Sequence, residues 1–239
     1  MGVGMGVRAV FIDVGGTLYE EKRINPPPWT HALALIIEQV SGRSVEPSDV
    51  LRIFLDVREE LYEDELREVW NLTVISRMLS RLGITPSPSL IEEAYTVFIN
   101  SIKNYMRPRP GAKRVLAAIK SMGLKLGVIS NTGSHSMIVD VLKRDGLLGL
   151  LDAVVTSQLV GWRKPSPRIF LFAAEILGVE PRHCIHVGDD PTADVGGAKA
   201  AGFIAVQYVR EGYQPSTRAD AHIRSLEELV PLIKSYADG

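Results

Sequence analysis

The chain has 239 residues, of which 46% are hydrophobic and 23% charged, so it can bury a core domain together with a modest insertion. A formal net charge of −1 excludes a strongly basic protein that attracts nucleic acid or acidic membranes through its overall field. The single cysteine, Cys184, excludes an internal disulfide and a cysteine-rich zinc site. We expect this thiol to be buried.

The amino-terminal stretch, residues 1–8, is too short and too weakly apolar for a signal peptide. No uninterrupted apolar run approaches the roughly 18 residues that a membrane span needs. We therefore expect a soluble, cytoplasmic protein with neither a membrane partner nor a nucleic-acid partner.

The first predicted element is a strand over residues 9–14, an unbroken apolar run that ends at Gly15 and Gly16. Unbroken apolarity, rather than alternation, is typical of a strand buried on both faces, as in a parallel sheet. The sequence therefore begins like the central strand of an α/β core.

The next stretch, residues 29–103, shows helical periodicity and no strand pattern. Prolines at 26–28 precede it and a second Pro-containing segment, residues 107–111, follows it, which is typical of stiff connections. We predict an all-helical cap domain over residues 25–106, inserted into a core of residues 1–24 and 107–239. Its predicted helices cover residues 29–40, 47–70, 72–82 and 89–105.

After the insertion, apolar runs of strand length alternate with helical patterns. This alternation predicts a Rossmann-like α/β fold, a doubly wound parallel sheet with helices on both faces. At the end of the chain, residues 220–223 predict an edge strand, and Ser225 with Glu228 predicts a capping box before a last helix. The strands cover residues 124–130, 153–156, 184–187 and 203–208, and the helices cover 112–121, 136–143, 167–177 and 192–201.

Four polar clusters follow predicted strand ends, where open α/β sheets place their ligands. Each cluster is ordinary by itself, because Asp and Ser are common turn and cap residues and most lysines are solvated. Their order and setting indicate a shared site. The clusters are residues 13–17, 130–132, 163–165 and 188–194.

In this arrangement the sequence resembles the haloacid dehalogenase-like hydrolases over residues 8–235. The resemblance implies a magnesium-dependent hydrolase, a phosphatase that acts on a small phosphorylated metabolite. Four patterns carry the resemblance, Phe11-Ile-Asp-x-Gly-Gly-Thr-Leu18, Val128-Ile-Ser-Asn131, Lys164-Pro-x-Pro-x-Ile-Phe170 and His186-Val-Gly-Asp189.

The resemblance also implies a nucleophile and a metal site. Asp13 would attack the phosphoryl group and form an aspartyl-phosphate, which water would hydrolyse. Asp13, Asp189 and the main-chain carbonyl of Gly15 would bind Mg²⁺, a hard cation that prefers oxygen ligands. Asp190 or Asp194 would complete or orient the metal shell, and the spacing favours Asp194.

A second set of residues would bind the phosphate. A phosphoryl group carries negative charge on three oxygens, so a carboxylate can attack it only where that charge is neutralised. By the resemblance, Lys164 would supply a positive charge and also hold Asp13 in place. The hydrogen-bond donors to the phosphoryl oxygens would be Ser130, Asn131 and the amides around Gly15 and Gly16.

One position departs from the family's pattern. Most phosphatases of the family have a second Asp two residues after the nucleophile, which serves as general acid and then general base, whereas this chain has Gly15. General acid–base catalysis contributes about 10²–10⁴-fold. We therefore expect weak activity that favours aryl or acyl phosphates, whose leaving groups need no proton.

Three alternatives remain at this point. The chain could be a 2-haloacid dehalogenase-type hydrolase, although such enzymes need no metal and generally lack the acidic cluster kept at residues 189–194. It could also bind a phosphorylated ligand without turnover. Residues 12–17 further resemble the first phosphate motif of actin-like sugar kinases, which would place Asp13 in a hairpin. The five histidines show no metal-ligand spacing and are expected to pack or to face solvent, with His186 nearest to the acidic cluster.

Overall fold

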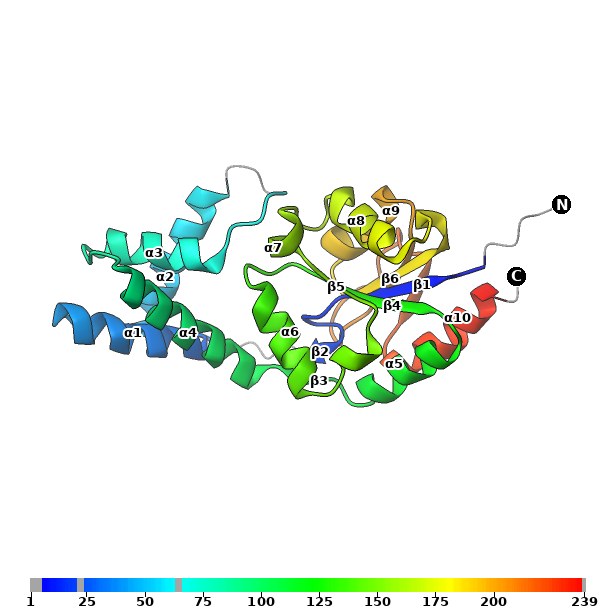
Figure 1. Ribbon diagram of the computed structural model, residues 1–239, viewed down its shortest axis with the longest axis horizontal. Helices are drawn as coiled ribbons and strands as arrows, with labels where there is room; N and C mark the ends of the chain where they lie inside the picture. The colour runs from blue at the N-terminus through cyan, green and yellow to red at the C-terminus, as the bar shows by residue number, and fades with distance from the viewer. Residues whose placement is uncertain (1–5, 21–23, 63–65, 238–239) are drawn as a thin grey trace.

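The computed structural model describes residues 6–20, 24–62 and 66–237. The prediction made on the amino-terminal stretch therefore falls largely outside the described residues. Within the described part, the chain folds into an α/β core with a separate layer of helices beside it (Figure 1).

The core is built on a parallel sheet of six strands in the order β5-β4-β1-β6-β7-β8. The central strand β1 pairs with β4 on one side and with β6 on the other. The strand order reverses beside β1, so the carboxyl ends of β1, β4 and β6 form the switch point where such sheets bind ligands. The strands are β1 (Ala9–Ile12), β4 (Lys125–Ser130), β5 (Ala153–Thr156), β6 (Cys184–Gly188), β7 (Ile204–Tyr208) and β8 (Ala221–Ile223).

Helices cover both faces of this sheet (Figure 1). Alternate residues of β1 enter different cores: Val10 and Ile12 pack in one hydrophobic cluster, Ala9 and Phe11 in another. This alternation confirms the predicted doubly wound α/β fold. One face carries α5 (Ala112–Ser121), α6 (His135–Arg144) and α10 (Leu229–Ala237), and the other carries α8 (Pro167–Leu177) and α9 (Gly197–Ala200).

Short elements complete the core. A helical turn α7 (Ser157–Val160) follows β5, and a π-helical turn over Pro191–Gly196 stands where we predicted the start of a regular helix. Single 3₁₀ turns cover Leu148–Leu150, Pro181–His183 and Leu226–Glu228. The capping box is confirmed at the last of these, where the amide of Ser225 donates to Oε1 of Glu228 over 2.9 Å.

Four helices form the layer beside the core, and three of them match the prediction within one residue at each end. The predicted helix 47–70 is wrong after Leu61, because the described residues beyond it, from Leu66 on, leave the helix axis and contact the core. Trp29 packs in their interior against Phe54 and Phe98, with ring centroids 4.7 and 5.1 Å apart. The helices are α1 (Pro28–Ser41), α2 (Pro47–Leu61), α3 (Asn71–Arg81) and α4 (Pro88–Tyr105).

The chain enters and leaves this helical layer through a two-stranded ribbon. Strand β2 (Tyr19–Glu20) pairs antiparallel with β3 (Arg107–Pro108), two short strands that the sequence did not predict. Because β1 pairs with β4 and β6, whereas β2 pairs with β3, Asp13 does not lie in the hairpin that an actin-like kinase requires. The sugar-kinase alternative is therefore wrong.

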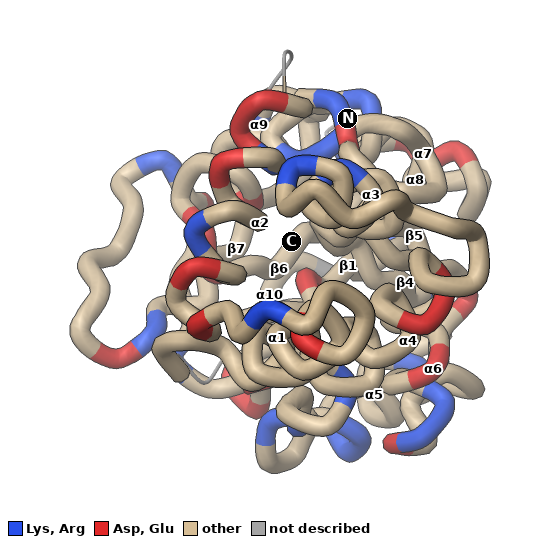
Figure 2. Tube along the Cα trace, turned by 90° about the vertical axis from the view of Figure 1, so that its left-hand side faces the viewer, with Lys and Arg blue, Asp and Glu red and all other residues tan. Residues whose placement is uncertain are grey.

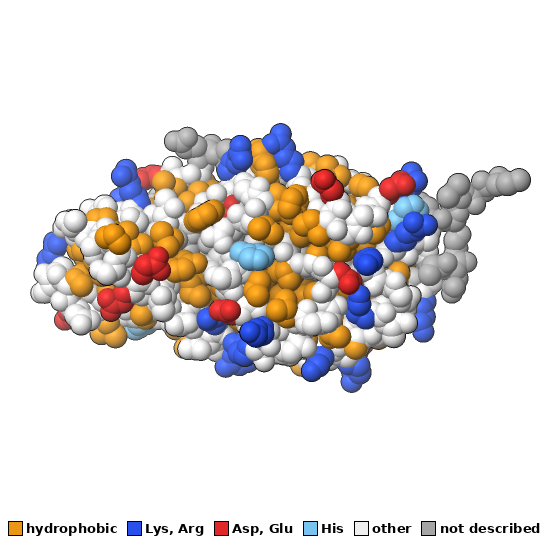
Figure 3. Space-filling model, in the orientation of Figure 1, with side chains coloured by type: hydrophobic (Ala, Val, Ile, Leu, Met, Phe, Trp, Pro, Cys, Tyr) orange, Lys and Arg blue, Asp and Glu red, His pale blue; other side chains and the backbone are white. Residues whose placement is uncertain are grey.

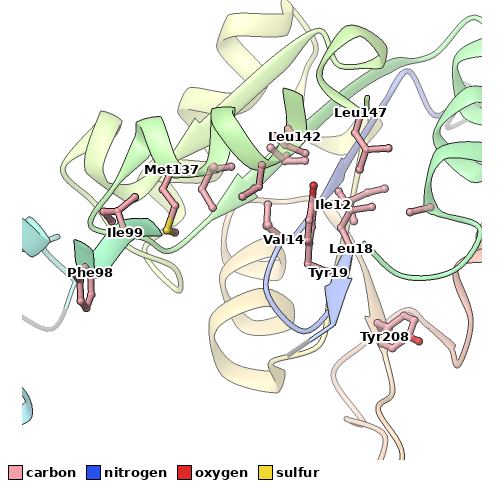
Figure 4. Packing of buried hydrophobic residues seen from close by; sticks show 14 of the residues in the cluster. Ile12, Val14, Leu18, Tyr19, Phe98, Ile99, Met137, Leu142, Leu147 and Tyr208 are labelled. Carbon is pink, nitrogen blue, oxygen red and sulfur yellow. The ribbon is translucent and has the colours of Figure 1, made fainter. Parts of the chain in front are cut away.

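One hydrophobic cluster runs from the core into the helical layer. Figure 4 shows Met137 of α6 beside Ile99 and Phe98 of α4, and Tyr19 packed among Val14, Leu18 and neighbouring core side chains. The ribbon and the helical layer therefore pack against the same buried apolar surface as the sheet.

Charged residues of both signs are distributed over the described surface (Figure 2). Basic and acidic residues are interspersed over the end of the molecule seen in Figure 2. Figure 3, in the orientation of Figure 1, shows hydrophobic side chains gathered in the middle of that face, with charged side chains mostly around its border. Across the described residues, none of the helices combines the length and apolarity needed to cross a bilayer.

Candidate active site

A cavity of about 520 Å³ lies at the carboxyl ends of β1, β4 and β6, which is the switch point of the sheet. Each predicted site residue except Gly16 lines it. These lining residues are Asp13, Gly15, Ser130, Asn131, Lys164, Asp189, Asp190 and Asp194. The parallel register explains this convergence, because Ile12 is aligned with both Val128 and Val187, so the chain leaves the three strands at one level.

Lys164 is the buried cation of the site, with a side chain only 3% exposed. Its Nζ donates to Oδ1 of Asp13 over 2.5 Å, to Oδ1 of Asp194 over 2.6 Å and to the carbonyl of Ile129 over 3.0 Å. All three ammonium hydrogens are therefore directed to fixed acceptors. The ammonium both orients Asp13 and offers positive charge beside it.

Asn131 fixes the main chain of Lys164. Its carboxamide accepts from the Lys164 amide over 2.8 Å and donates to the Lys164 carbonyl over 2.9 Å. The side chain of Asn131, which we expected to donate to a phosphoryl oxygen, is thus engaged with the lysine loop. Ser130, at the end of β4, is buried and lines the cavity.

Asp194 is fixed by hydrogen bonds to several neighbours. Besides Lys164, its Oδ1 contacts Nε2 of His186 over 2.8 Å, and its Oδ2 accepts from the amide of Asp190 over 3.1 Å. A Cβ at Gly188 would stand 2.1 Å from Cγ of Asp194, so glycine at this position is what lets the carboxylate approach the strand.

Asp189 lies on the other side of the cluster, where Thr17 and Arg210 contact it. The Thr17 hydroxyl donates to Oδ1 over 3.0 Å, and Nε of Arg210 lies 3.0 Å from Oδ2. Gly16 has φ +81°, and a Cβ there would stand 2.7 Å from Oδ1 of Asp189. The loop after β1 and the acidic loop after β6 can therefore meet only with glycine at position 16.

Asp190 takes a different role from its two acidic neighbours. Its Oδ1 accepts from the amides of Thr192 and Ala193 over 2.7 and 2.8 Å, which caps the helical turn that follows. The carboxylates that converge are those of Asp13, Asp189 and Asp194, whose ligand atoms all lie within 4.8 Å of one another.

The electrostatics of this cluster leave an excess of negative charge. Burial raises the pKa of Asp13 and of Asp189 above their ordinary values, despite the nearby cations. Burial acts the same way on Asp194, but Lys164 holds its pKa below the usual range. Burial also lowers the pKa of His186, which favours a neutral imidazole. Three carboxylates thus face the two permanent cations Lys164 and Arg210, and a further cation would complete the balance.

The helical layer contributes to the site in two ways. Ile102 of α4 and Met106 line the cavity together with the carboxylates, so the lining is partly charged and partly apolar. Main-chain hydrogen bonds also tie this layer to the core, from the Arg163 amide to the Leu66 carbonyl over 2.7 Å and from the Asn71 amide to the Gly133 carbonyl over 3.2 Å.

A cluster of side chains built around an ion pair reinforces these contacts. We call this cluster the cap latch, and it consists of Tyr62, Glu68, Ser157 and Arg163. Nη1 of Arg163 lies 3.0 Å from Oε2 of Glu68 and 2.5 Å from the Tyr62 hydroxyl. The Ser157 hydroxyl donates to the same Glu68 carboxylate. The Glu68 side chain is 1% exposed and that of Arg163 is 19% exposed, so the acid is buried and its partner is partly buried.

Sequence reasoning missed three contributors to the site. His186 reads as a core histidine, yet it bonds Asp194. Thr17 reads as a turn residue, and Arg210 stands beyond β7 with no motif around it. The closeness of His186 to the acidic cluster was the one available signal. The contacts of Thr17 and Arg210 depend on tertiary structure.

The fold and the site define an α/β protein with a lysine-braced acidic centre at the switch point of its sheet. A model of the haloacid dehalogenase-like hydrolases matches residues 7–202. The chain belongs to this family and is a hydrolase, as the sequence predicted.

Individual relatives agree with this assignment. The chain is 29% identical over 237 residues to a glyceraldehyde 3-phosphate phosphatase of Methanopyrus kandleri, which covers 97% of this chain and 99% of that protein. It superposes on an HAD phosphatase from Thermococcus onnurineus with a TM-score of 0.69 and 26% identity, covering 95% of this chain and 98% of that one. A 2-haloacid dehalogenase from Pseudomonas syringae pv. Tomato DC3000 gives a TM-score of 0.74 at 22% identity, covering 96% and 98%, a likeness of fold.

Proposed function

We propose that this hydrolase is a magnesium-dependent phosphatase that acts on a small phosphorylated metabolite, with Asp13 as its nucleophile. The observation that carries the proposal is the convergence of Asp13, Asp189 and Asp194 within 4.8 Å of one another, with Nζ of Lys164 2.5 Å from Asp13. Buried carboxylates in excess of their cations suit a site for a metal and a phosphoryl group rather than a structural ion pair.

The residues present fit a magnesium ion. The donor set consists of carboxylate oxygens, which Mg²⁺ prefers, and burial raises the pKa of Asp13 and Asp189, an effect that a bound cation would offset. Asp13, Asp189 and Asp194 would hold the ion, together with the Gly15 carbonyl that the family resemblance implies. When bound, magnesium neutralises part of the negative charge of the phosphoryl oxygens.

The side chains of the cavity would then carry out two displacements. A carboxylate oxygen of Asp13 attacks phosphorus, the bond from phosphorus to the ester oxygen breaks, and the leaving group departs with the electron pair. The Lys164 ammonium and the Ser130 hydroxyl stabilise the charge on the phosphoryl oxygens, and the Asn131 main-chain N–H is a further donor. Water then attacks the aspartyl-phosphate, which releases inorganic phosphate and restores Asp13.

Gly15 governs which substrates turn over rapidly. It offers no group to protonate the leaving oxygen or to activate the water, so substrates with good leaving groups are favoured. A Cβ added at Gly15 meets no atom within 4 Å, so a side chain can begin there without a clash. The restriction is therefore chemical rather than steric.

The shape of the cavity supports a small substrate. Its volume of about 520 Å³ and its partly apolar wall from Ile102 and Met106 suit a short carbon chain that bears one phosphate. Because the Methanopyrus kandleri relative is named for glyceraldehyde 3-phosphate, we propose short phosphorylated metabolites of this kind as the substrate class.

Release of inorganic phosphate from glyceraldehyde 3-phosphate and from p-nitrophenyl phosphate, each with Mg²⁺ or with EDTA, tests the proposal. We expect metal-dependent release from both, faster from the aryl ester, and a Gly15→Asp variant that selectively accelerates the alkyl ester. Absence of phosphate release from a phosphometabolite panel would leave the binding protein as the better account. Release of halide from a 2-haloacid without metal would instead support the dehalogenase.

A further inference from the structure

A second cavity of about 540 Å³ adjoins the proposed phosphatase site, and Arg210 lines both. Three arginines and two tyrosines make up most of its wall. We call it the arginine cavity; its lining residues are Arg109, Tyr208, Val209, Arg210, Glu211, Tyr213 and Arg224.

The charge of the arginine cavity is positive, in a protein whose net charge is −1. Three guanidinium groups and one carboxylate, that of Glu211, line it, and Asp189 of the acidic centre lies 3.0 Å from Nε of Arg210, which leaves an excess of one positive charge. Arg224 is exposed, and within the described part of the chain no carboxylate forms an ion pair with its guanidinium. The excess charge is therefore available to an anionic ligand.

Two of the arginines are held in place before any ligand arrives. Arg109 donates from Nε to the Thr17 carbonyl over 2.8 Å and from Nη2 to the Gly16 carbonyl over 2.7 Å, and its guanidinium lies 4.5 Å from the ring centre of Tyr208. Arg210 lies 4.6 Å from the ring centre of Tyr213. Such anchoring reduces the side-chain entropy that binding would otherwise cost.

The geometry points to a small phosphate-bearing anion as the ligand. Guanidinium groups bind phosphate oxygens through paired, charge-assisted hydrogen bonds, and several of them together favour a multiply charged ligand. A volume of about 540 Å³ is in the range of small-molecule sites. We propose that the arginine cavity binds a phosphate-bearing small molecule at a site separate from the phosphoryl site at Asp13.

Isothermal titration with pyrophosphate in EDTA tests this proposal apart from catalysis. The magnesium that the phosphoryl site would use is absent under these conditions, and a variant of the cavity lining assigns the binding to the arginine cavity. We expect one pyrophosphate per chain, about tenfold weaker binding by an Arg224→Gln variant, and weaker binding of the dicarboxylate succinate. Arg218→Gln is the matched control, because Arg218 is also exposed and precedes β8 as Arg224 follows it, but Arg218 does not line the cavity.

Three results would overturn the proposal: no pyrophosphate binding by the wild type in EDTA, equal binding by the Arg224→Gln and Arg218→Gln variants, or equal affinities for succinate and pyrophosphate. Because the experiment uses neither magnesium nor turnover, its failure would leave the phosphatase proposal untouched. Failure of the phosphatase assay would likewise leave this site standing.

Discussion

Two adjacent residues, Arg163 and Lys164, belong to two buried charge clusters that differ in their balance. Arg163 enters the cap latch, where it meets the carboxylate of Glu68 and the hydroxyl of Tyr62. Lys164 enters the acidic centre, where one ammonium serves Asp13 and Asp194 together. The latch pairs one cation with one anion, whereas the centre holds more carboxylates than cations.

This difference separates a structural ion pair from a site built for chemistry. A balanced, hydrogen-bonded pair needs nothing further and holds two parts of the chain together. An unbalanced cluster raises the pKa of its carboxylates until a proton or another cation offsets their charge, and proteins retain such arrangements where charged ligands bind. We therefore expect substitutions in the acidic centre to change catalysis as well as stability, and substitutions in the cap latch to change stability.

The largest expected effect is on catalysis in the acidic centre. Asp13→Asn removes the attacking carboxylate, and we expect kcat to fall on the order of 10⁴-fold or more. Asp190→Asn is the matched control, because asparagine also caps helices and Asp190 caps the turn at residues 191–196. Steady-state phosphate release measures both variants. A similar loss of kcat in the Asp190→Asn control would mean that Asp190 does more than cap the helical turn.

The next effect is on stability. Lys164→Met leaves Asp13 and Asp194 buried without their shared partner, and breaking a buried ion pair in this way costs about 3–5 kcal/mol. Urea unfolding in EDTA measures the loss. Lys120→Met is the comparison, because Lys120 and Asp152 are 33% and 26% exposed and such pairs contribute about 0–1 kcal/mol. Equal losses of stability in the Lys164→Met and Lys120→Met variants would show that burial does not increase the cost of removing the lysine.

The cap latch should respond more moderately. Glu68→Gln keeps the shape of the side chain but removes the charge that Arg163 faces, and we expect a loss of about 1–3 kcal/mol in the free energy of unfolding. Glu60→Gln, in the exposed ion pair with Arg81 on the same helical layer, should leave unfolding unchanged within error. A latch variant as stable as this control would indicate that the main-chain contacts alone hold the layer.

The smallest effect concerns Asp145, which accepts from the Tyr19 hydroxyl over 2.8 Å and pairs with Arg144. The hydrogen bond from Arg144 holds the pKa of Asp145 below its ordinary value. Between the pKa values of Asp145 in the folded and unfolded states, the folded state therefore binds fewer protons. The stabilisation that Asp145 contributes is present above about pH 4 and is lost in stronger acid. Asp145→Asn should cost under about 1 kcal/mol at about pH 7 and less at about pH 3. Unfolding curves at the two pH values test this, and a pH-independent difference would contradict it.

Much of the core and of the candidate site could be predicted from the sequence, because buried parallel strands appear in it as unbroken apolar runs. The strands of the core and the clusters that follow them were predicted to within about two residues at each end. The site residues converge because the strand ends do, which follows from the topology alone. The choice between Asp190 and Asp194 rested on spacing, and the structure directs the Asp190 carboxylate to a helix cap.

The rest depends on contacts between distant parts of the chain. The predicted helix 47–70 continued past Leu61 because the pattern stayed amphipathic, whereas residues from Leu66 on instead bond to the loop before Lys164. The cap latch joins Glu68 to Arg163 across 95 positions, and Arg210 reaches Asp189 from beyond β7. Local propensity contains no signal for such pairs, nor for the two-residue strands of the ribbon.

The most direct test of the central claim is to trap the phosphorylated enzyme. Acid quenching during turnover of p-nitrophenyl phosphate with Mg²⁺, followed by peptide mapping, should find one phosphoryl group on Asp13. The group should be labile to hydroxylamine, absent with EDTA, and slow to hydrolyse because Gly15 offers no base. Sustained phosphate release with Asp13 unmodified throughout, or with the phosphoryl group on another residue, would contradict the account.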